Sequence, residues 1–336
     1  MTDLDFSVIF PTYNRCEVVE ETLQRLIDQD YPKDRFEIIA VDNSTDGTPA
    51  MVERMAEVSR ASGGPAIRLL RLPERLPAIK RNRGLEVARG RFVYFINDDM
   101  WFAPDALSQH AATHASWTEP VAVLGSCFQS PRMPRTTFTS FYDPFPYNQM
   151  TGFVDGPVPY RFFWSMNLSL PRDVMIERNL RFHEDWAHIG HEDIELGWRW
   201  CGAGLKAIYN PRALGEHYHP HTLASACRLQ ESIGRGLRDL EVLVPDEDML
   251  TRYGVVTRHA APRTLIRSLV RAALFNSRTV PPLMRVLDGN ERDSFWARWV
   301  YWKIMLWHTN YGYRHEPRRH PSSLVSMARP YEQARP

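Results

Sequence analysis

Short apolar runs alternate with amphipathic stretches through the first 125 residues, and this alternation constrains the fold more than any other feature. The apolar runs, each of a length suited to a buried strand, occupy residues 6–10, 36–41, 67–72, 91–96 and 121–125. Apolar residues at helical spacing fall between them, at residues 17–28, 49–60, 78–88 and 106–115. Strands that alternate with helices predict an α/β fold with a doubly wound, mostly parallel sheet. Gly90 follows the third helical stretch, and we expect it to end that helix with a left-handed backbone.

The pattern continues beyond residue 125 with longer irregular stretches. Strands are expected at 165–170 and 204–208, and helices at 172–178 and 191–202. Residues 126–163 are rich in Pro, Phe and Tyr and predict a long loop or lid. From residue 224 the pattern is helical, with breaks at Pro245, Pro262 and Pro281. We therefore expect a domain over 1–235, divided near residue 125, and a helical C-terminal region over 236–336.

The formal net charge of +1 is the sum of two parts of the chain with opposite charge. Residues 251–336 carry 15 Arg or Lys and 5 Asp or Glu, which gives +10. Residues 1–250 carry the other 26 and 35, which gives −9. No uncharged apolar stretch approaches the ~18 residues of a spanning helix, and the acidic N-terminus lacks the features of a signal peptide, so we expect a cytoplasmic protein.

Polar residues follow three predicted strands where each strand ends, and in a parallel sheet these ends should meet at one edge. They are Thr12, Tyr13, Asn14, Asp42, Asn97, Asp98 and Asp99. Carboxylates at a strand end are typical ligands of Mg²⁺ or Mn²⁺, although Asn and Asp are also common in turns. The absence of GxGxxG after the first strand and of GxxxxGK[ST] removes the main support for dinucleotide oxidoreductases and P-loop NTPases.

Three further clusters are candidates for chemistry. Glu192 and Asp193 open a helix, where they either favour the helix dipole or supply a general base. His217, His219 and His221 alternate as strand residues on one face would, and we favour His217 as a ligand of the cation held by Asp99. The basic cluster is either an exposed helix face or a diphosphate contact, and it comprises Arg75, Lys80, Arg81 and Arg83.

Five ordered segments within about residues 6–235 resemble glycosyltransferase family 2, which has the GT-A fold. The first three are SVIFPTYNR at 7–15, IAVDNSTDGT at 39–48, and KRNRG at 80–84 with ARGRFVYFINDD at 88–99. The others are NLSLPR at 167–172 with GHEDIELGWR at 190–199, and YNPRA at 209–213 followed by His217. Two positions depart from the family pattern: Asn97 replaces the first acid of its DXD metal motif, and Asn43 follows Asp42 where a second acid is usual.

The resemblance implies an inverting, metal-dependent hexosyl- or deoxyhexosyltransferase that uses a nucleoside-diphosphate sugar. It places the donor on the 1–125 half and the acceptor on the 126–235 half. Asp193 is then the base, with Glu192 beside it, and Asp99, His217 and His219 hold Mn²⁺ or Mg²⁺. The donor-binding residues it implies are Pro11, Thr12, Tyr13, Asn14, Asp42, Arg75, Lys80, Asn82, Asn97 and Asp98.

Other interpretations remain open. A nucleotidyltransferase would need a Gly-rich phosphate loop that residues 11–14 do not provide, and a non-catalytic nucleotide-sugar-binding module would not need the acids Asp99, Glu192 and Asp193. The acceptor is a glycan, a lipid-linked molecule or a small molecule, and no nucleic-acid-binding motif is present. The aromatic and basic segment 290–315 either packs internally or in a homodimer, or lies peripherally on the inner face of an anionic membrane.

Overall fold

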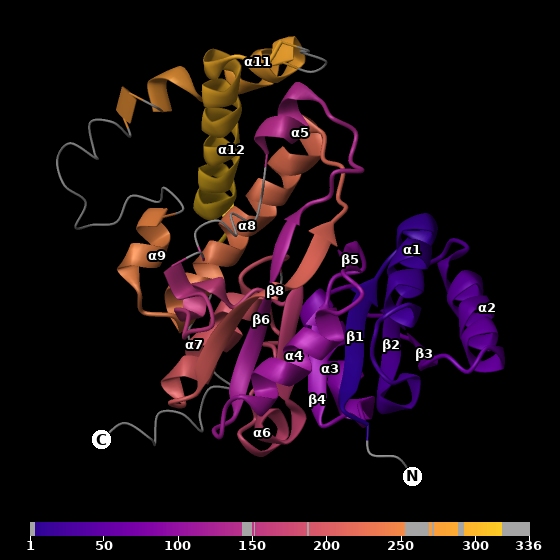
Figure 1. Ribbon diagram of the computed structural model, residues 1–336. Coiled ribbons are helices and arrows are strands. Elements are labelled where there is room, and N and C mark those ends of the chain that lie inside the picture. The colour runs from indigo at the N-terminus through magenta and orange to yellow at the C-terminus, as the bar shows by residue number, and fades with distance from the viewer. Residues whose placement is uncertain are drawn as a thin grey trace. The chain divides into compact units, whose positions relative to one another are not determined.

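The computed structural model describes residues 4–142, 150, 152–186, 188–252, 269–270, 272–287 and 292–317 (Figure 1). The chain divides into two compact units. Unit 1 comprises residues 1–132, 145–184 and 192–219, and unit 2 comprises residues 133–144, 185–191 and 220–336. The domain boundary predicted at residue 235 falls inside a single helix, α8 (Leu223–Leu243), which belongs to unit 2.

Unit 1 is built on an eight-stranded, mostly parallel sheet. Its strands are β1 (Phe6–Thr12), β2 (Phe36–Asp42), β3 (Ala66–Arg71), β4 (Phe92–Ile96), β5 (Met100–Phe102), β6 (Val121–Gln129), β7 (Asn167–Pro171) and β8 (Lys206–His217). The strand order is β3-β2-β1-β4-β7-β6-β8-β5. Neighbouring strands are parallel except around β7, which is antiparallel to β4 and β6, and at β5, which is antiparallel to β8. The predicted doubly wound, mostly parallel sheet is confirmed.

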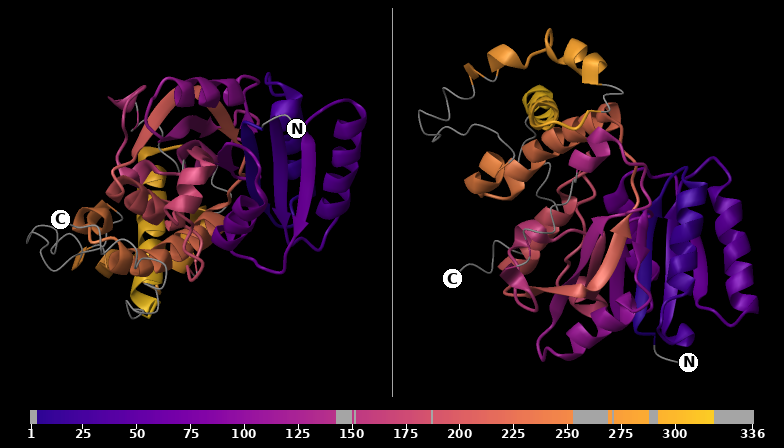
Figure 2. Two further views of the ribbon diagram at one scale, coloured as in Figure 1. Left: turned by 90° about the horizontal axis from the view of Figure 1, so that it is seen from below. Right: turned by 45° about the horizontal axis from the view of Figure 1, so that its top comes forward.

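Helices cover both faces of this sheet, which is why β1 and β2 are buried along almost their whole length (Figures 1 and 2). Gly84 of α3 (Pro77–Val87) faces Ile9. The ring of His110 of α4 (Ala106–Ala115) lies 4.5 Å from the ring of Tyr94, which pairs with Val8 of β1. Successive strand residues point to opposite faces, so α3 and α4 lie on opposite sides of the sheet.

The helices of unit 1 are α1 (Cys16–Ile27), α2 (Thr48–Ala61), α3 (Pro77–Val87), α4 (Ala106–Ala115), α6 (Arg172–Glu177) and α7 (Glu192–Gly202), with 3₁₀ turns η1 (Lys33–Arg35) and η3 (Tyr160–Phe162).

Gly90 is needed for close packing and not for a left-handed backbone, so that expectation was wrong. The helix cap at Ala88 is extended, and Gly90 is absent from the residues with positive φ. A Cβ on Gly90 would instead lie 2.5 Å from the backbone carbon of Phe6 and 2.5 Å from the nitrogen of Ser7. The chain therefore passes so close to β1 that no side chain fits at this position.

The segment 126–163 is more ordered than a long loop. β6 continues to Gln129 through a register shift between Gly125 and Ser126, after which it pairs with the second half of β8. Bridges join Val154 to Tyr209 and Pro157 to Ile208. Residues 143–149 and 151 lie outside the described residues, and a lid over the site stays a prediction.

Unit 2 is helical over its described residues. Its helices are α5 (Thr137–Phe141), α8 (Leu223–Leu243), α9 (Glu247–Arg252), α11 (Val280–Leu287) and α12 (Phe295–His315). α12 lies alongside α8 (Figure 2), and a Cβ on Gly234 of α8 would lie 2.0 Å from the carbonyl oxygen of Thr309. The two helices therefore meet at a small-residue contact. None of the helices in the described parts of the chain has both the length and the apolar character needed to span a bilayer.

Of the three predicted breaks in the C-terminal helical region, two are confirmed. α8 ends immediately before the cap residue Val244, next to Pro245. Residues 275–279 form bends and turns and α11 begins at Val280, so the helical pattern is interrupted just before Pro281. Pro281 then lies in the first turn of α11, where a missing N–H costs nothing. Pro262 lies outside the described residues.

Candidate active site

The polar ends of β1, β2 and β4 come together at one edge of the sheet, as expected. Thr12 pairs with Asp42 in the parallel register, and Thr12 Oγ1 donates a hydrogen bond to Asp98 Oδ2 at 2.8 Å. Asn14 has a left-handed backbone (φ 51°), which asparagine tolerates better than most residues. Its amide oxygen accepts from the backbone N–H of Thr45 at 2.8 Å, which ties the end of β1 to the end of β2.

Asp42 is fully buried at the end of β2 and is already held by protein groups. Its Oδ1 accepts hydrogen bonds from the backbone N–H of Ser44, at 2.9 Å, and from the Ser44 hydroxyl. Its Oδ2 forms an ion pair with Arg71 Nη1 at 3.1 Å. The Arg71 side chain is half exposed, so this cation can turn away when a ligand approaches. Arg71, which the sequence analysis did not consider, therefore belongs to the site.

α3 turns Lys80 and Arg81 into the protein, so for these two residues the interpretation as an exposed helix face is wrong. Lys80 is buried and donates to the carbonyl oxygen of Thr12 and to Asn43 Oδ1, both at 2.6 Å. Burial lowers the pKa of Lys80 to about 8, although the nearby carboxylates of Asp42 and Asp98 oppose the shift. Lys80 thus fastens the ends of β1 and β2 together.

The other members of the predicted donor-binding set from this region are dispersed. Asn82 is fully buried and exchanges hydrogen bonds with the backbone of Phe182, at 2.8 and 3.0 Å. Arg83 pairs with Glu184, and Arg75 is exposed on the loop between β3 and α3. Asn82 therefore supports the fold of its surroundings and does not lie with the strand-end cluster.

Asp98 and Asp99 share a counter-ion that the sequence analysis did not assign. Arg15 Nη1 lies 3.0 Å from Asp98 Oδ1 and 2.9 Å from Asp99 Oδ2, and Nη2 lies 3.3 Å from His219 Nδ1. Burial raises the pKa of Asp98, although Arg15 opposes that shift. Burial would also raise the pKa of Asp99, but His217, His219 and Arg15 outweigh it and hold that pKa well below its ordinary value.

Two histidines approach Asp99 because of how β5 pairs with β8. Met100 lies opposite His217 in the antiparallel register, and the backbone N–H of Tyr218 donates to the carbonyl oxygen of Asp99 at 2.9 Å. His217 Nε2 lies 3.4 Å from Asp99 Oδ1, and His219 Nδ1 lies 2.5 Å from Asp99 Oδ2.

Asp99, His217 and His219 thus form a candidate donor set for a metal ion. One donor atom from each residue lies within 4.8 Å of the others. A buried carboxylate with two imidazole nitrogens suits a divalent cation such as Mn²⁺. His221 lies instead in unit 2, with its ring 5.2 Å from that of Tyr142, so it does not extend this set.

Glu192 and Asp193 lie in the first turn of α7 with different surroundings. Glu192 is buried and pairs with Arg81 Nη1 at 3.0 Å, while Arg81 Nη2 donates to Asn97 Oδ1 at 3.0 Å. Arg81 therefore links the acidic pair of α7 to the Asn97-Asp98-Asp99 run. The sequence placed Arg81 in a basic cluster but gave no signal for this partner, which lies 111 residues away.

Asp193 is partly buried and is held by N–H and O–H donors. Its Oδ2 accepts from the backbone N–H of Ser165 at 2.9 Å and from the Ser165 hydroxyl at 3.2 Å, and its Oδ1 accepts from the N–H of Ile194 at 2.9 Å. Burial, with a further contribution from the Glu192 carboxylate, raises the pKa of Asp193 to about 6. A carboxylate with such a pKa can accept a proton near neutral pH.

Sequence comparisons identify relatives of this chain. A family profile described as "Glycosyl transferase family 2" matches residues 7–172. The chain is 28% identical over 273 residues to validoxylamine A glucosyltransferase of Streptomyces hygroscopicus subsp. jinggangensis, which covers 71% of this chain and 62% of the relative. With a second such enzyme, from subsp. limoneus, the match covers 58% of the relative, so the chain spans about 60% of the length of these curated relatives.

Solved structures share the fold. Mannosyltransferase PcManGT from Pyrobaculum calidifontis, solved with GDP-Man and Mn²⁺, has a TM-score of 0.62 at 22% identity over 92% of this chain and 87% of that chain. Staphylococcus aureus TarS 1-349 in complex with UDP has a TM-score of 0.51 at 19% identity, over 93% and 91% of the two chains. The fold is that of GT-A glycosyltransferases. The region that matches the profile, residues 7–172, therefore belongs to glycosyltransferase family 2.

Proposed function

We propose that this chain transfers a sugar from a nucleoside-diphosphate sugar to an acceptor hydroxyl, with inversion at the sugar carbon and with the help of a divalent cation. The observation that carries the proposal is the Asp99, His217 and His219 cluster at the edge of the sheet where Thr12, Asp42 and Asp98 also meet. The similar solved structures were obtained with GDP-Man and Mn²⁺ and with UDP, which supports the same ligand classes here.

The donor nucleotide is proposed to lie along the ends of β1 and β2. Asp42 Oδ2 would accept from a ring N–H of the base, a donor that both uracil and guanine provide, once Arg71 turns away. Tyr13, about half exposed, offers a ring face to the base, with Pro11 and Asn14 beside it. Asp98 and Asn97 would contact the ribose and the diphosphate, and the exposed Arg75 is free to reach the diphosphate from its loop.

The cation is proposed to bind between Asp99, His217 and His219. When bound there it would offset the negative charge that develops on the departing nucleoside diphosphate. Two imidazole nitrogens favour Mn²⁺ over Mg²⁺, which prefers carboxylate and water oxygens. The two cations, each with UDP or GDP, can be compared by thermal shift, because a bound ligand raises the unfolding temperature by mass action.

Asp193 is proposed to take the proton from the acceptor hydroxyl as its oxygen attacks the sugar carbon. Its hydrogen bonds to Ser165 and Ile194 fix the carboxylate in one orientation, and its pKa of about 6 leaves it ionised at neutral pH. Glu192, paired with Arg81, positions the start of α7. One base acting on one incoming hydroxyl suits direct displacement, which inverts the configuration at the sugar carbon.

Replacement of the proposed base tests this function. Asp193→Asn should lower the turnover of nucleoside diphosphate release by about 10²–10⁴-fold, the usual contribution of a general base, while UDP or GDP binding persists. The readout is nucleoside diphosphate released from UDP- and GDP-sugars, with water and a panel of glycan and lipid-linked acceptors, in the presence of Mn²⁺.

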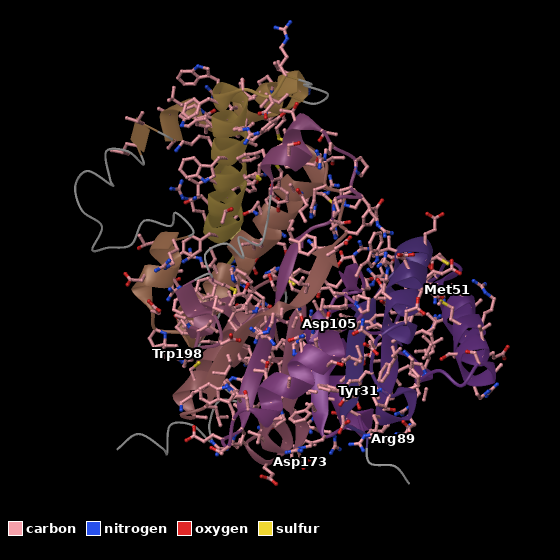
Figure 3. All side chains as sticks on the ribbon, viewed as in Figure 1. Tyr31, Met51, Arg89, Asp105, Asp173 and Trp198 are labelled. Atoms are coloured by element: carbon pink, nitrogen blue, oxygen red, sulfur yellow. The ribbon has the colours of Figure 1, made fainter. Side chains whose placement is uncertain are left out.

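A matched control is available in the same unit. Asp173 also lies in the first turn of a helix, α6 (Figure 3). Its side chain is 76% exposed. The preceding residue, Arg172, donates its backbone N–H to the carbonyl oxygen of Arg91, just before β4. Asp173→Asn should leave turnover unchanged. Normal turnover in Asp193→Asn would exclude this residue as the base, and nucleotide binding with no release from any donor would favour a non-catalytic module.

A further inference from the structure

The two faces of α12 differ in what they contact. Ala297, Tyr301, Ile304 and Met305 are buried in the core of unit 2. At 3.6 residues per turn, a second set of side chains falls within an arc of about 120° on another side of the helix. We call this set the aromatic face, and it consists of Phe295, Trp296, Trp299, Trp302 and Lys303.

Three rings of the aromatic face are exposed. Phe295 is 73%, Trp296 70% and Trp302 49% exposed, whereas Trp299 is partly buried against the core of unit 2. Ring centroids lie 5.6 Å apart for Phe295 and Trp296 and 6.2 Å apart for Trp296 and Trp299. Single exposed apolar residues are ordinary, but three large exposed aromatic side chains within one arc of a helix mark an interaction surface.

Cationic groups accompany these rings. Lys303 Nζ lies 3.8 Å from the centroid of Trp302 and 5.5 Å from that of Trp299. Arg298, on the same helix, is exposed and pairs with Asp293, while Arg292 precedes the helix and Arg285 lies exposed on α11. Tryptophan with lysine and arginine around it is the composition of helices that lie in the headgroup region of a bilayer.

We propose that the aromatic face docks on an anionic lipid surface. Trp296, Trp302 and Phe295 would enter the headgroup region while Lys303 and Arg298 pair with lipid phosphates. A second copy of the chain is the less suitable occupant, because the same basic residues would then line both sides of a twofold interface. The proposal concerns unit 2 alone and does not depend on the proposed sugar transfer.

Vesicle binding by the full chain tests the proposal. We expect co-sedimentation with phosphatidylglycerol-containing vesicles, weaker binding to pure phosphatidylcholine, and a loss of binding as salt increases. Trp296→Ser with Trp302→Ser, and separately Arg298→Glu with Lys303→Glu, should each lower the partition coefficient about tenfold or more. Val58→Ser, a change at a 61%-exposed apolar residue of α2, is the control and should bind as the unmodified chain does.

Two further measurements separate the possible occupants. Tryptophan fluorescence should shift to shorter wavelength with anionic vesicles and be quenched by brominated lipid, in the unmodified chain only. Equal vesicle binding by the tryptophan variant would overturn the proposal. A second result would also overturn the proposal: the unmodified chain forms a dimer in sedimentation velocity and does not bind vesicles, and the tryptophan variant no longer forms that dimer.

Discussion

At the scale of single residues, Arg15 is the least expected member of the site. Its guanidinium lies 2.9 Å from Asp99 Oδ2, and it also contacts Asp98 and His219. Two cationic groups at one carboxylate repel each other strongly. Arg15 therefore balances the buried carboxylates, and its charge would oppose a divalent cation at Asp99.

Removal of this internal competitor should strengthen metal binding. For Arg15→Gln we predict a dissociation constant for Mn²⁺ that is lower by about tenfold, which corresponds to ~1.4 kcal/mol. Electron paramagnetic resonance of free Mn²⁺ during a titration measures it directly. Arg25→Gln is the control, because Arg25 also lies on α1 and pairs with a carboxylate, Glu21, outside the site. Weaker Mn²⁺ binding by Arg15→Gln would show that Arg15 assists the cation and does not compete with it.

At the scale of helices and strands, periodicity predicted most of unit 1. The four helices expected before residue 125 begin and end within a residue or two of α1, α2, α3 and α4, because apolar residues at helical spacing predict an amphipathic helix directly. The three-residue strand β5 was missed, since so short a segment has no measurable period. Yet the pairing of β5 with β8 brings His217 to Asp99. The sequence therefore suggested the proposed metal ligands but not the strand pairing that brings them together.

The same limit explains which site residues were predicted. Carboxylates at strand ends are visible in sequence because the chain places them after apolar runs. The partners of Arg15 and Arg81 lie 83 and 111 residues away, so no local pattern reveals that these two residues neutralise the acids. For Asn82 the family motif suggested a contact with the donor, and nothing in the sequence indicated that its amide is hydrogen-bonded to the backbone of Phe182.

The first turn of α7 should determine the acidic limb of the pH profile. Since burial and the Glu192 carboxylate raise the pKa of Asp193 to about 6, kcat/KM should fall as the pH drops through that value and the base becomes protonated. Glu192→Gln removes one negative charge and leaves the Arg81 cation beside Asp193, so the limb should move to lower pH. Initial rates of nucleoside diphosphate release across pH measure this. A limb that stays in place or moves upward would show that Glu192 does not act on Asp193.

At the scale of the whole molecule, the two units carry opposite formal charge. Unit 2 has 19 Arg or Lys and 13 Asp or Glu, which gives +6, while unit 1 has 22 and 27, which gives −5, and every residue assigned to donor, metal or base lies in unit 1. The near-zero net charge is thus the sum of an acidic unit, in which Arg15, Arg81 and Arg71 pair with the buried carboxylates, and a basic helical unit. The structure assigns the two proposed activities to side chains of separate units.

Separate units should give separable defects. Asp99→Asn removes the carboxylate of the metal cluster, so Mn²⁺-dependent stabilisation by UDP or GDP should be lost while partition onto anionic vesicles stays as in the unmodified chain. Trp296→Ser with Trp302→Ser should do the reverse, because both side chains are exposed on α12 of unit 2, whereas the cluster belongs to unit 1. Thermal shift with nucleotide and Mn²⁺, run beside vesicle co-sedimentation on both variants, measures the two properties independently. Rising salt should weaken vesicle binding far more than nucleotide binding, since exposed basic side chains are screened and a buried metal site is not. A variant of either unit that lost both properties would mean that the two surfaces act together, and the assignment of one activity to each unit would then be wrong.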